Sequence, residues 1–436
     1  MAVKQYYFRI IKSPVWRPIA KLAALFLIII VAIVLISVNK FKTVESRALF
    51  LQAHPSITKL LPVYWQARKL SDIIYLPYFF QHDAVPTYLL QISPKDLEKL
   101  NQSLPEAFMG VSLTERMFVP AVFRARGKIY KVTVRYRGDR ARHWNAPKKS
   151  YLVKFDKKNL FQGQSEVSFI IPDDRLFAVE DFNNYRARKL GLNTPVSGFA
   201  NLDVNSQGSA LYFAIESWSR EMLDKWDVSP DSIFYSNSNG GESLWQDVQN
   251  WQVSVGTSKQ NNVELSRLEE LIKLLNTAPD SEFNARIFDL IDKENFYTWQ
   301  MHQELANSPH EFDDNVRLYY DSKQGKFFFV PWDVEISPPA HSYFRQYGKL
   351  GQRIFSNPFF LQEKNQRLYE YVADEKNLED DLRFYDQTYS SFKISLYKDR
   401  LKIYANRSAD QAYELHRQEI IDIFHYLRGK VSPSPG

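Results

Sequence analysis

A run of seventeen residues near the N-terminus, sixteen of them apolar, constrains this chain more than any other feature. Residues 22–38 read LAALFLIIIVAIVLISV, and Ser37 is the one polar residue among them. A helix of this length just spans the hydrocarbon core of a bilayer. The run is longer than the core of a usual signal peptide, and no small-x-small cleavage pattern stands out after it. The sequence therefore predicts an uncleaved transmembrane anchor.

The charges around this run predict its orientation. Residues 1–21 carry five basic side chains and no acidic one. The side of an anchor with the denser positive charge stays in the cytoplasm. We therefore expect a cytoplasmic basic segment at 1–21, a single pass at 22–38, and the rest of the chain outside the bacterial inner membrane.

The net charge and the absence of cysteine exclude several kinds of site. The formal charge is +6 at pH 7, and five of these charges lie in residues 1–21, so 6 − 5 leaves +1 for the remainder. Nucleic-acid binding needs a basic face on the folded domain, so we expect no nucleic-acid partner. Without cysteine there is no disulfide, no thiolate nucleophile and no Cys-ligated zinc.

Hydrophobic periodicity and turn residues divide the rest of the chain and predict an α+β fold with an antiparallel sheet and a helical C-terminal part. We expect strands at 87–92, in a meander over 119–155, and in hairpins at 199–216 and 317–329. We expect helices from Pro94 and at 180–190, 263–276 and 293–305. The expected divisions are a membrane-proximal stalk at 39–83, a main domain at 84–345, a helical region at 346–430 and a flexible tail at 431–436.

An acidic hairpin is the first candidate site. The turn SKQGK joins the predicted strands at 317–321 and 327–329, so residues before the first strand meet those after the second. The polar residues at these ends are Asp313, Asp314, Asn315, Asp333 and Glu335. Clustered carboxylates repel one another unless a cation neutralises them, which favours Mg²⁺ or Mn²⁺. Solvated loop acids are the alternative interpretation.

A basic hairpin is the second candidate site. It runs from Arg135 through the Gly138 turn and returns along the sequence KKSYLVKF, which begins at Lys148. We expect this returning segment to be a strand. The cations of the hairpin include Arg137, Lys148 and Lys149, and a lysine that projects from a strand can hold nucleotide phosphates as a point charge. A solvated basic face or a contact with an anionic polymer remains the alternative.

Other familiar motifs are absent from the sequence. There is no GxxxxGK[ST], GxGxxG, GxSxG or HExxH pattern. His302 and His310 are eight residues apart, whereas a helical metal pair is three or four apart, so these histidines are interpreted as structural.

Four blocks in order resemble the spore-coat-protein-H (CotH) kinase family. They lie between about residues 84 and 337, and they are RGD…PKKSY, NNYRARKLGLNTP, LYFAIE and NxxLYYD…PWD. The resemblance implies a divergent protein-kinase-like fold that uses ATP and a divalent metal to phosphorylate protein substrates. The chain departs from the family in having RGD where the family has Arg-Gly-Asn, and in placing its acids closer to Asn315.

The resemblance also implies residue roles. Lys148 looks like the phosphate-binding lysine, with Lys149 as the fallback and Glu180 as its partner. Glu216 looks like part of the nucleotide pocket. Asn315 and Asp333 look like metal ligands, and Glu335 stands where the family has a further acid. Asp313 or Asp314 would orient the substrate hydroxyl.

Three functions stay open at this point. The first is metal-dependent phosphoryl transfer from ATP to a protein or to an envelope glycan. The second is an inactive pseudokinase or scaffold that binds an anionic polymer in cell-surface or exopolysaccharide assembly. The third is a phosphohydrolase that uses the same metal site.

Overall fold

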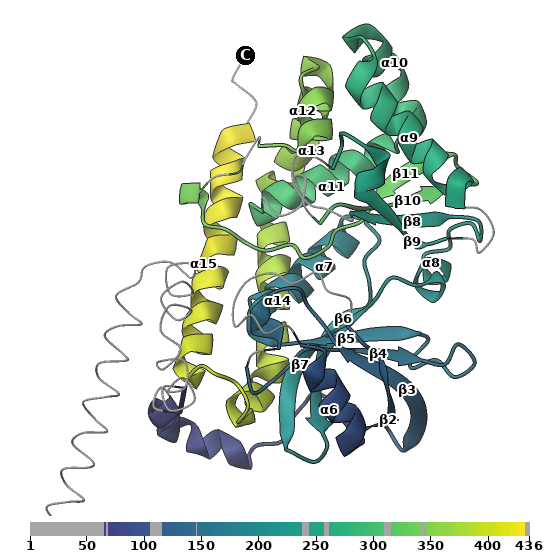
Figure 1. The fold of residues 1–436 in the computed structure, drawn as a ribbon. Coiled ribbons are helices and arrows are strands. Elements are labelled where there is room, and N and C mark those ends of the chain that lie inside the picture. Colours follow the sequence, from purple (N-terminus) through teal and green to yellow (C-terminus); the bar gives the residue numbers. More distant parts are fainter. Residues whose placement is uncertain are drawn as a thin grey trace, which may run out of the picture.

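Two sheets and a set of helices make up the fold (Figure 1). The computed structural model describes residues 65–66, 69–104, 116–144, 146–237, 244–256, 261–308, 315–341, 343 and 346–431. The predicted segments at 1–21 and 22–38, most of the stalk and the tail at 432–436 lie outside these residues. Among the described helices, none is long and apolar enough to cross a membrane.

The first sheet is a closed barrel with the strand order β1-β2-β3-β4-β5-β7-β6. Its strands are β1 (Thr87–Ile92), β2 (Val119–Ala125), β3 (Lys128–Tyr136), β4 (Tyr151–Phe155), β5 (Glu166–Ile170), β6 (Ser197–Val204) and β7 (Ser209–Glu216). The predicted α+β class, the meander and the strands at 87–92 and 199–216 are confirmed, although β4 begins at Tyr151 and not at Lys148. The predicted antiparallel pairing holds in this sheet except between β1 and β6, which pair in parallel and close the barrel. Closure leaves no unpaired edge on this sheet.

Aromatic rings fill the barrel. Phe123 is buried, and the centroid of its ring lies 5.2 Å from those of Phe155 and Phe161. Both pairs meet edge to face, which is a favourable geometry for aromatic rings. Alternate residues of β2 are buried, as the period of two requires.

The second sheet carries the acidic hairpin and has the order β11-β10-β8-β9. Its strands are β8 (Ile233–Asn237), β9 (Trp251–Val255), β10 (Arg317–Asp321) and β11 (Lys326–Phe329). The predicted hairpin at 317–329 is confirmed, with Leu318 opposite Phe329. The central position of β10, next to β8, was not predicted.

Helices cover both sheets. They are α6 (Pro94–Gln102), α7 (Val179–Lys189), α8 (Arg220–Lys225), α9 (Asn261–Thr277), α10 (Asp280–Leu290), α11 (Lys293–Ala306), α12 (Lys349–Phe355), α13 (Pro358–Ala373), α14 (Glu375–Lys398) and α15 (Asn406–Val431). Helices α9 to α12 lie at the end of the molecule that carries the second sheet, while α14 and α15 run down toward the barrel (Figure 1). Helix α7 lies between the two sheets in the same view.

His302 in α11 is structural, as predicted. The ring is fully buried, and Nε2 donates to the carbonyl oxygen of Asn183 in α7 at 2.9 Å. Burial, together with nearby Arg186, lowers the pKa of His302 to about 3. The ring is therefore neutral in the folded protein at neutral pH.

This histidine makes stability depend on pH. Its folded pKa is below the unfolded value near 6.5, so the stability it contributes is complete above pH 6.5 and is lost as pH falls. We expect the loss to reach about 2 kcal/mol at pH 5. In urea unfolding at pH 7.5 and pH 5, the stability deficit of His302→Gln should therefore shrink at the lower pH. An equal stability deficit at pH 7.5 and pH 5 would contradict a neutral, buried His302 with a lowered pKa.

Candidate active site

The acidic hairpin brings Asn315 and Asp333 to the same end of the second sheet. The amide of Val330, just after β11, donates to the carbonyl oxygen of Arg317 at 2.9 Å, so the two chain ends leave the sheet side by side. Asn315 and Asp333 both have left-handed backbones, with φ of 54° and 57°. This conformation is uncommon outside glycine and is concentrated at functional sites.

Arg175 holds Asp333 in an ion pair that the sequence did not predict. Arg175 ends the 3₁₀ helix η3 (Pro172–Arg175) and is buried. Its guanidinium forms ion pairs with Asp174, Glu180 and Asp333, the first two at 3.2 Å. Glu180 was expected to pair with Lys148, and this expectation is wrong, because Arg175 is its cationic partner.

A strained link sets the position of Arg175 relative to Glu180. Leu176 and Phe177 join η3 to α7, and their φ values are 47° and 59°. Bulky residues rarely adopt this conformation. Two contacts stabilise it, since the amide of Phe177 donates to Pro172 O at 2.8 Å and its ring lies edge-on to Tyr404 at 5.4 Å. The link therefore places Glu180, in the first turn of α7, beside Arg175.

Two more arginines lie near this ion-pair cluster. Burial and the nearby charge of Arg175 lower the pKa of Arg137 to about 10, although Asp174 opposes the shift. Arg142 is exposed, so desolvation opposes its charge only in part, and ion pairs with Asp173 at 3.3 Å and Asp174 at 3.2 Å raise its pKa. Both arginines are therefore positively charged at neutral pH.

Asp174 connects these cations to a buried histidine. His143 Nε2 lies 3.3 Å from Asp174 Oδ2, and its Nδ1 lies 3.0 Å from Ser150 Oγ. Burial lowers the pKa of His143 to about 3, so the ring is neutral at neutral pH. Burial alone would raise the pKa of Asp174, but Arg175 and the other neighbouring cations hold it below its usual value. Asp174 is therefore an anion within a cationic surrounding.

Lys148 lies elsewhere, in a buried ion pair with Asp399. Its Nζ lies 2.5 Å from Asp399 Oδ2 and donates to Leu211 O at 2.9 Å, and both side chains are almost fully buried. Lys148 Nζ also lies over the ring of Tyr212, 5.3 Å from the ring centroid. The predicted strand position is wrong, because β4 starts at Tyr151. Lys148 connects the barrel to the segment after α14.

The two remaining predicted nucleotide ligands also have protein partners. Lys149 Nζ donates to the carbonyl oxygen of Trp144 at 2.6 Å, and burial lowers the pKa of this lysine. Glu216 ends β7 and is buried, and it accepts a hydrogen bond from Lys225 Nζ at 2.6 Å. Burial raises the pKa of Glu216, and Lys225 partly offsets that rise.

Asn183 is a further residue that the sequence did not single out. It is buried in α7, and its Nδ2 donates to the carbonyl oxygen of Val334 at 2.9 Å. This bond fixes the residue directly after Asp333. In the sequence, the only signal was the polar pair Asn183-Asn184 within a predicted helix. Both side chains are buried in the structure, and buried polar groups need hydrogen-bond partners.

The predicted metal ligands are hard oxygen donors of the kind that Mg²⁺ binds. Asp333 and Glu335 supply carboxylates, and Asn315 supplies an amide oxygen. These residues fit such a cation chemically, although a cation at Asp333 would have to compete with Arg175. Within the described part of the chain, no three acids or histidines are grouped as a complete metal site. Asp313 and Asp314 lie outside that part.

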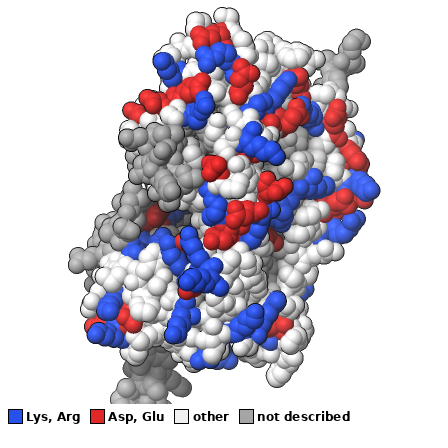
Figure 2. Space-filling view, turned by 90° about the vertical axis from the view of Figure 1, so that its right-hand side faces the viewer, with Lys and Arg blue, Asp and Glu red and all other residues white. Residues whose placement is uncertain are grey.

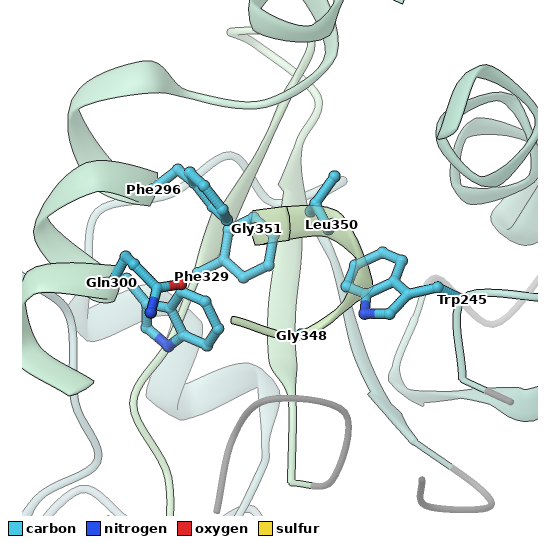
Figure 3. A pocket seen from close by; sticks show the side chains of 8 residues that line it. Trp245, Phe296, Gln300, Phe329, Gly348, Leu350 and Gly351 are labelled. Carbon is cyan, nitrogen blue, oxygen red and sulfur yellow. The ribbon is translucent and has the colours of Figure 1, made fainter. Parts of the chain in front are cut away.

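Two cavities lie away from these residues. One has a volume of about 10 Å³ between α11, β11 and the start of α12, with Trp299, Gln300 and Phe329 in its wall (Figure 3). It has room for about one water molecule and none for a nucleotide. The other, of about 190 Å³, opens at the mouth of the barrel beside Tyr88 and Ser197. Neither is lined by a predicted site residue.

Charges of both signs are interspersed over the face that contains α8 and the outer strands of the barrel (Figure 2). On β3 and β4 this mixture includes exposed Lys131 and the ion pair of Lys154 with Glu166 of β5 at 2.8 Å. The visible face therefore offers no extended surface of a single sign.

Comparison with known proteins gives a family match over much of the chain. A family model described as CotH kinase protein matches residues 134–418, which is more than half of the sequence. Inner spore coat protein H of Bacillus subtilis (strain 168) is 25% identical over 259 residues, covering 58% of this chain and 68% of that protein. The crystal structure of a Helicobacter pylori proinflammatory kinase, CtkA, aligns with 12% identity and a TM-score of 0.25, covering 65% of this chain and 95% of that one. A TM-score this low adds no support for the fold.

Proposed function

The chain belongs to the CotH kinase family, and from this we propose that it is an atypical kinase that transfers a phosphoryl group from ATP to a protein or envelope glycan. The observation that carries the proposal is the ion pair of Asp333, which follows the acidic hairpin, with buried Arg175, close to half-buried Arg137 and exposed Arg142. Phosphoryl transfer needs positive charge around the phosphates and oxygen ligands for a divalent cation.

We propose that the arginine cluster, rather than Lys148, supplies the positive charge. Arg175 contacts Asp333, and Arg137 and Arg142 lie close to the same acids. Arginine presents a planar fork of donors that suits phosphate oxygens. Lys148 is already occupied by Asp399 and Leu211.

The proposed reaction is an in-line displacement at the γ-phosphorus of ATP. A hydroxyl oxygen of the acceptor forms the new bond to phosphorus while the bond to the bridging oxygen breaks. ADP leaves with that electron pair, and the hydroxyl proton passes to Asp313 or Asp314. Arg175 and Arg137 neutralise the phosphate oxygens, and Asn183 holds the backbone that carries Asp333.

A divalent cation, Mg²⁺ or Mn²⁺, fits this site through Asp333, Asn315 and Glu335. When bound, it would supply charge neutralisation to the phosphates. Asp333 would be one of the residues that hold the cation, and Arg175 beside it would contact the phosphate oxygens of the nucleotide.

The pseudokinase is the second candidate, and one observation favours it. The ion pair of Arg175 with Asp333 neutralises the acid that a metal requires. If this pair persists in the presence of nucleotide and metal, the domain binds partners without catalysis, and an anionic polymer is the expected ligand.

Thermal unfolding of the full chain in detergent micelles distinguishes these candidates. A ligand that binds only the folded state raises the melting temperature, and 100 times Kd of ligand stabilises by about 2.7 kcal/mol. We expect a shift that needs ATP and Mg²⁺ together and that is lost in Asp333→Asn. Glu282→Gln removes an exposed acid of α10 and serves as the matched control. Absence of a shift in the unsubstituted chain would reject the kinase and favour the pseudokinase.

We also propose that residues 22–38 anchor the protein in the inner membrane with the folded domain outside the cytoplasm. The charge asymmetry of residues 1–21 supports this orientation. Flotation of the full chain with lipid vesicles after an alkaline wash checks the anchor, since a chain without one would stay at the bottom of the gradient.

A further inference from the structure

The 3₁₀ segment η1 (Lys69–Phe80) exposes an unusual amount of apolar surface. Eleven large hydrophobic side chains are exposed among the described residues, and five of them lie in these twelve residues. They are Leu70, Ile73, Ile74, Leu76 and Phe80, with exposed fractions from 51% to 91%. We refer to these five side chains as the η1 patch. Such a concentration marks an interaction surface rather than scattered surface residues.

The opposite side of η1 is fixed to the folded domain. Tyr75 is buried, its hydroxyl donates to Asp410 Oδ2 at 2.5 Å, and its ring lies 4.7 Å from that of Tyr397. Asp72, the acid of this segment, faces inward and accepts from the amide of Asn406 at 2.8 Å. The outward face is therefore mainly apolar, and the acid of the segment is used in the contact with the folded domain.

Positive charge borders the η1 patch. Lys69 Nζ donates to the carbonyl oxygen of Arg400 at 2.9 Å, so these two basic residues lie together at the start of η1. The side chain of Arg400 is exposed to solvent. The next acid along the chain, Asp83, is neutralised by Lys398 at 2.8 Å.

We propose that the η1 patch rests in the interface of the bilayer that holds the chain, with its apolar side chains at the boundary of headgroups and acyl chains. Apolar residues on one face and cations beside it are what an anionic membrane surface binds. Thirty residues, 39–68, separate the apolar run at 22–38 from Lys69, and η1 is the first helical segment of the folded domain that is described in full after the proposed anchor. The proposal rests on the anchor but is independent of phosphoryl transfer.

The patch would orient the whole domain. In Figure 1, η1 and the lower part of the barrel lie at one end of the molecule, and α9 and α10 lie at the other. With η1 on the membrane, the barrel would lie nearer to the bilayer than α9 and α10.

Single-cysteine labelling tests this placement, because the natural chain contains no cysteine. The full chain is reconstituted into phosphatidylethanolamine–phosphatidylglycerol vesicles with a nitrobenzoxadiazole label at Ile74→Cys or Phe80→Cys. Phe359→Cys in α13 is the matched control, since Phe359 is also an exposed apolar residue, at 60%. Quenching by acyl-chain bromines and by aqueous iodide is compared for the three labels.

We expect brominated lipid to reduce the emission at 74 and 80 and iodide to leave it unchanged, with the reverse at 359. Labels at 74 and 80 that respond to iodide as the control does would overturn the proposal. Protection from iodide without quenching by bromine would also overturn it, and would assign the patch to residues 39–64 or to a second copy. Because the vesicles are floated first, failure of the anchor is recognised separately, and ATP binding is measured independently.

Discussion

Replacing Asp399 with alanine is expected to destabilise the protein by about 3–5 kcal/mol, the usual cost of leaving one member of a buried ion pair alone. The substitution strands the ammonium of Lys148, which is 3% exposed and has no solvent to compensate it. It also removes the acceptor for the amide of Leu211 at 3.2 Å and for the amide of Leu401 at 2.9 Å. Urea unfolding followed by circular dichroism measures the loss.

Lys148→Met should have a related but smaller effect. The methionine fills the space of the lysine stem, and Asp399 keeps its hydrogen bonds from the backbone amides of Leu401 and Lys402. The double variant Lys148→Met, Asp399→Leu removes both charges and should recover part of the lost stability. If Asp399→Ala unfolds at the same urea concentration as the unsubstituted chain, Lys148 is not held by this carboxylate.

Arg175→Met is expected to weaken binding of ATP in the presence of Mg²⁺. A hydrogen bond to a charged group contributes about 1.5–3 kcal/mol, which corresponds to roughly 10- to 150-fold in Kd. The guanidinium of Arg175 forms an ion pair with Asp333. It is therefore the cation best placed to contact a phosphate that binds beside this acid. Equilibrium titration of ATP at saturating Mg²⁺ gives the affinity.

Arg175→Lys separates charge from geometry in the same titration. Lysine keeps the charge but cannot present two parallel donors, so we expect an affinity between those of the unsubstituted chain and Arg175→Met. Equal affinities for the two variants would show that the planar fork is essential. Unchanged affinity in both would remove Arg175 from the site.

Local features of the fold were predictable from the sequence. The hairpin at 317–329 follows from a Gly-containing turn between two apolar strands. The turn and both strands lie within thirteen consecutive residues. Ser93 and Pro94 likewise predict the start of α6, and Ser93 Oγ indeed accepts from the amide of Asp96 at 3.1 Å. Each of these depends on neighbours in sequence.

The partners of the charged residues were not predictable in this way. Lys148 and Asp399 are 251 residues apart in the sequence, and only the closed barrel and the end of α14 bring them together. Arg175 and Asp333 lie on segments far apart in the sequence. The left-handed link at Leu176 and Phe177, which places Glu180 beside Arg175, is a conformation that no propensity of bulky residues would suggest. The family resemblance favoured a lysine, and the structure buries that lysine in an ion pair.

The most direct test of this account is to measure the Kd of ATP with Mg²⁺ for Lys148→Met and Arg175→Met side by side, at a temperature at which both are folded by circular dichroism. We predict that Lys148→Met binds within about twofold of the unsubstituted chain, as expected of a residue without contact to the ligand. Arg175→Met should bind at least about tenfold more weakly. The reverse order would place the phosphates at Lys148 and contradict the proposed site.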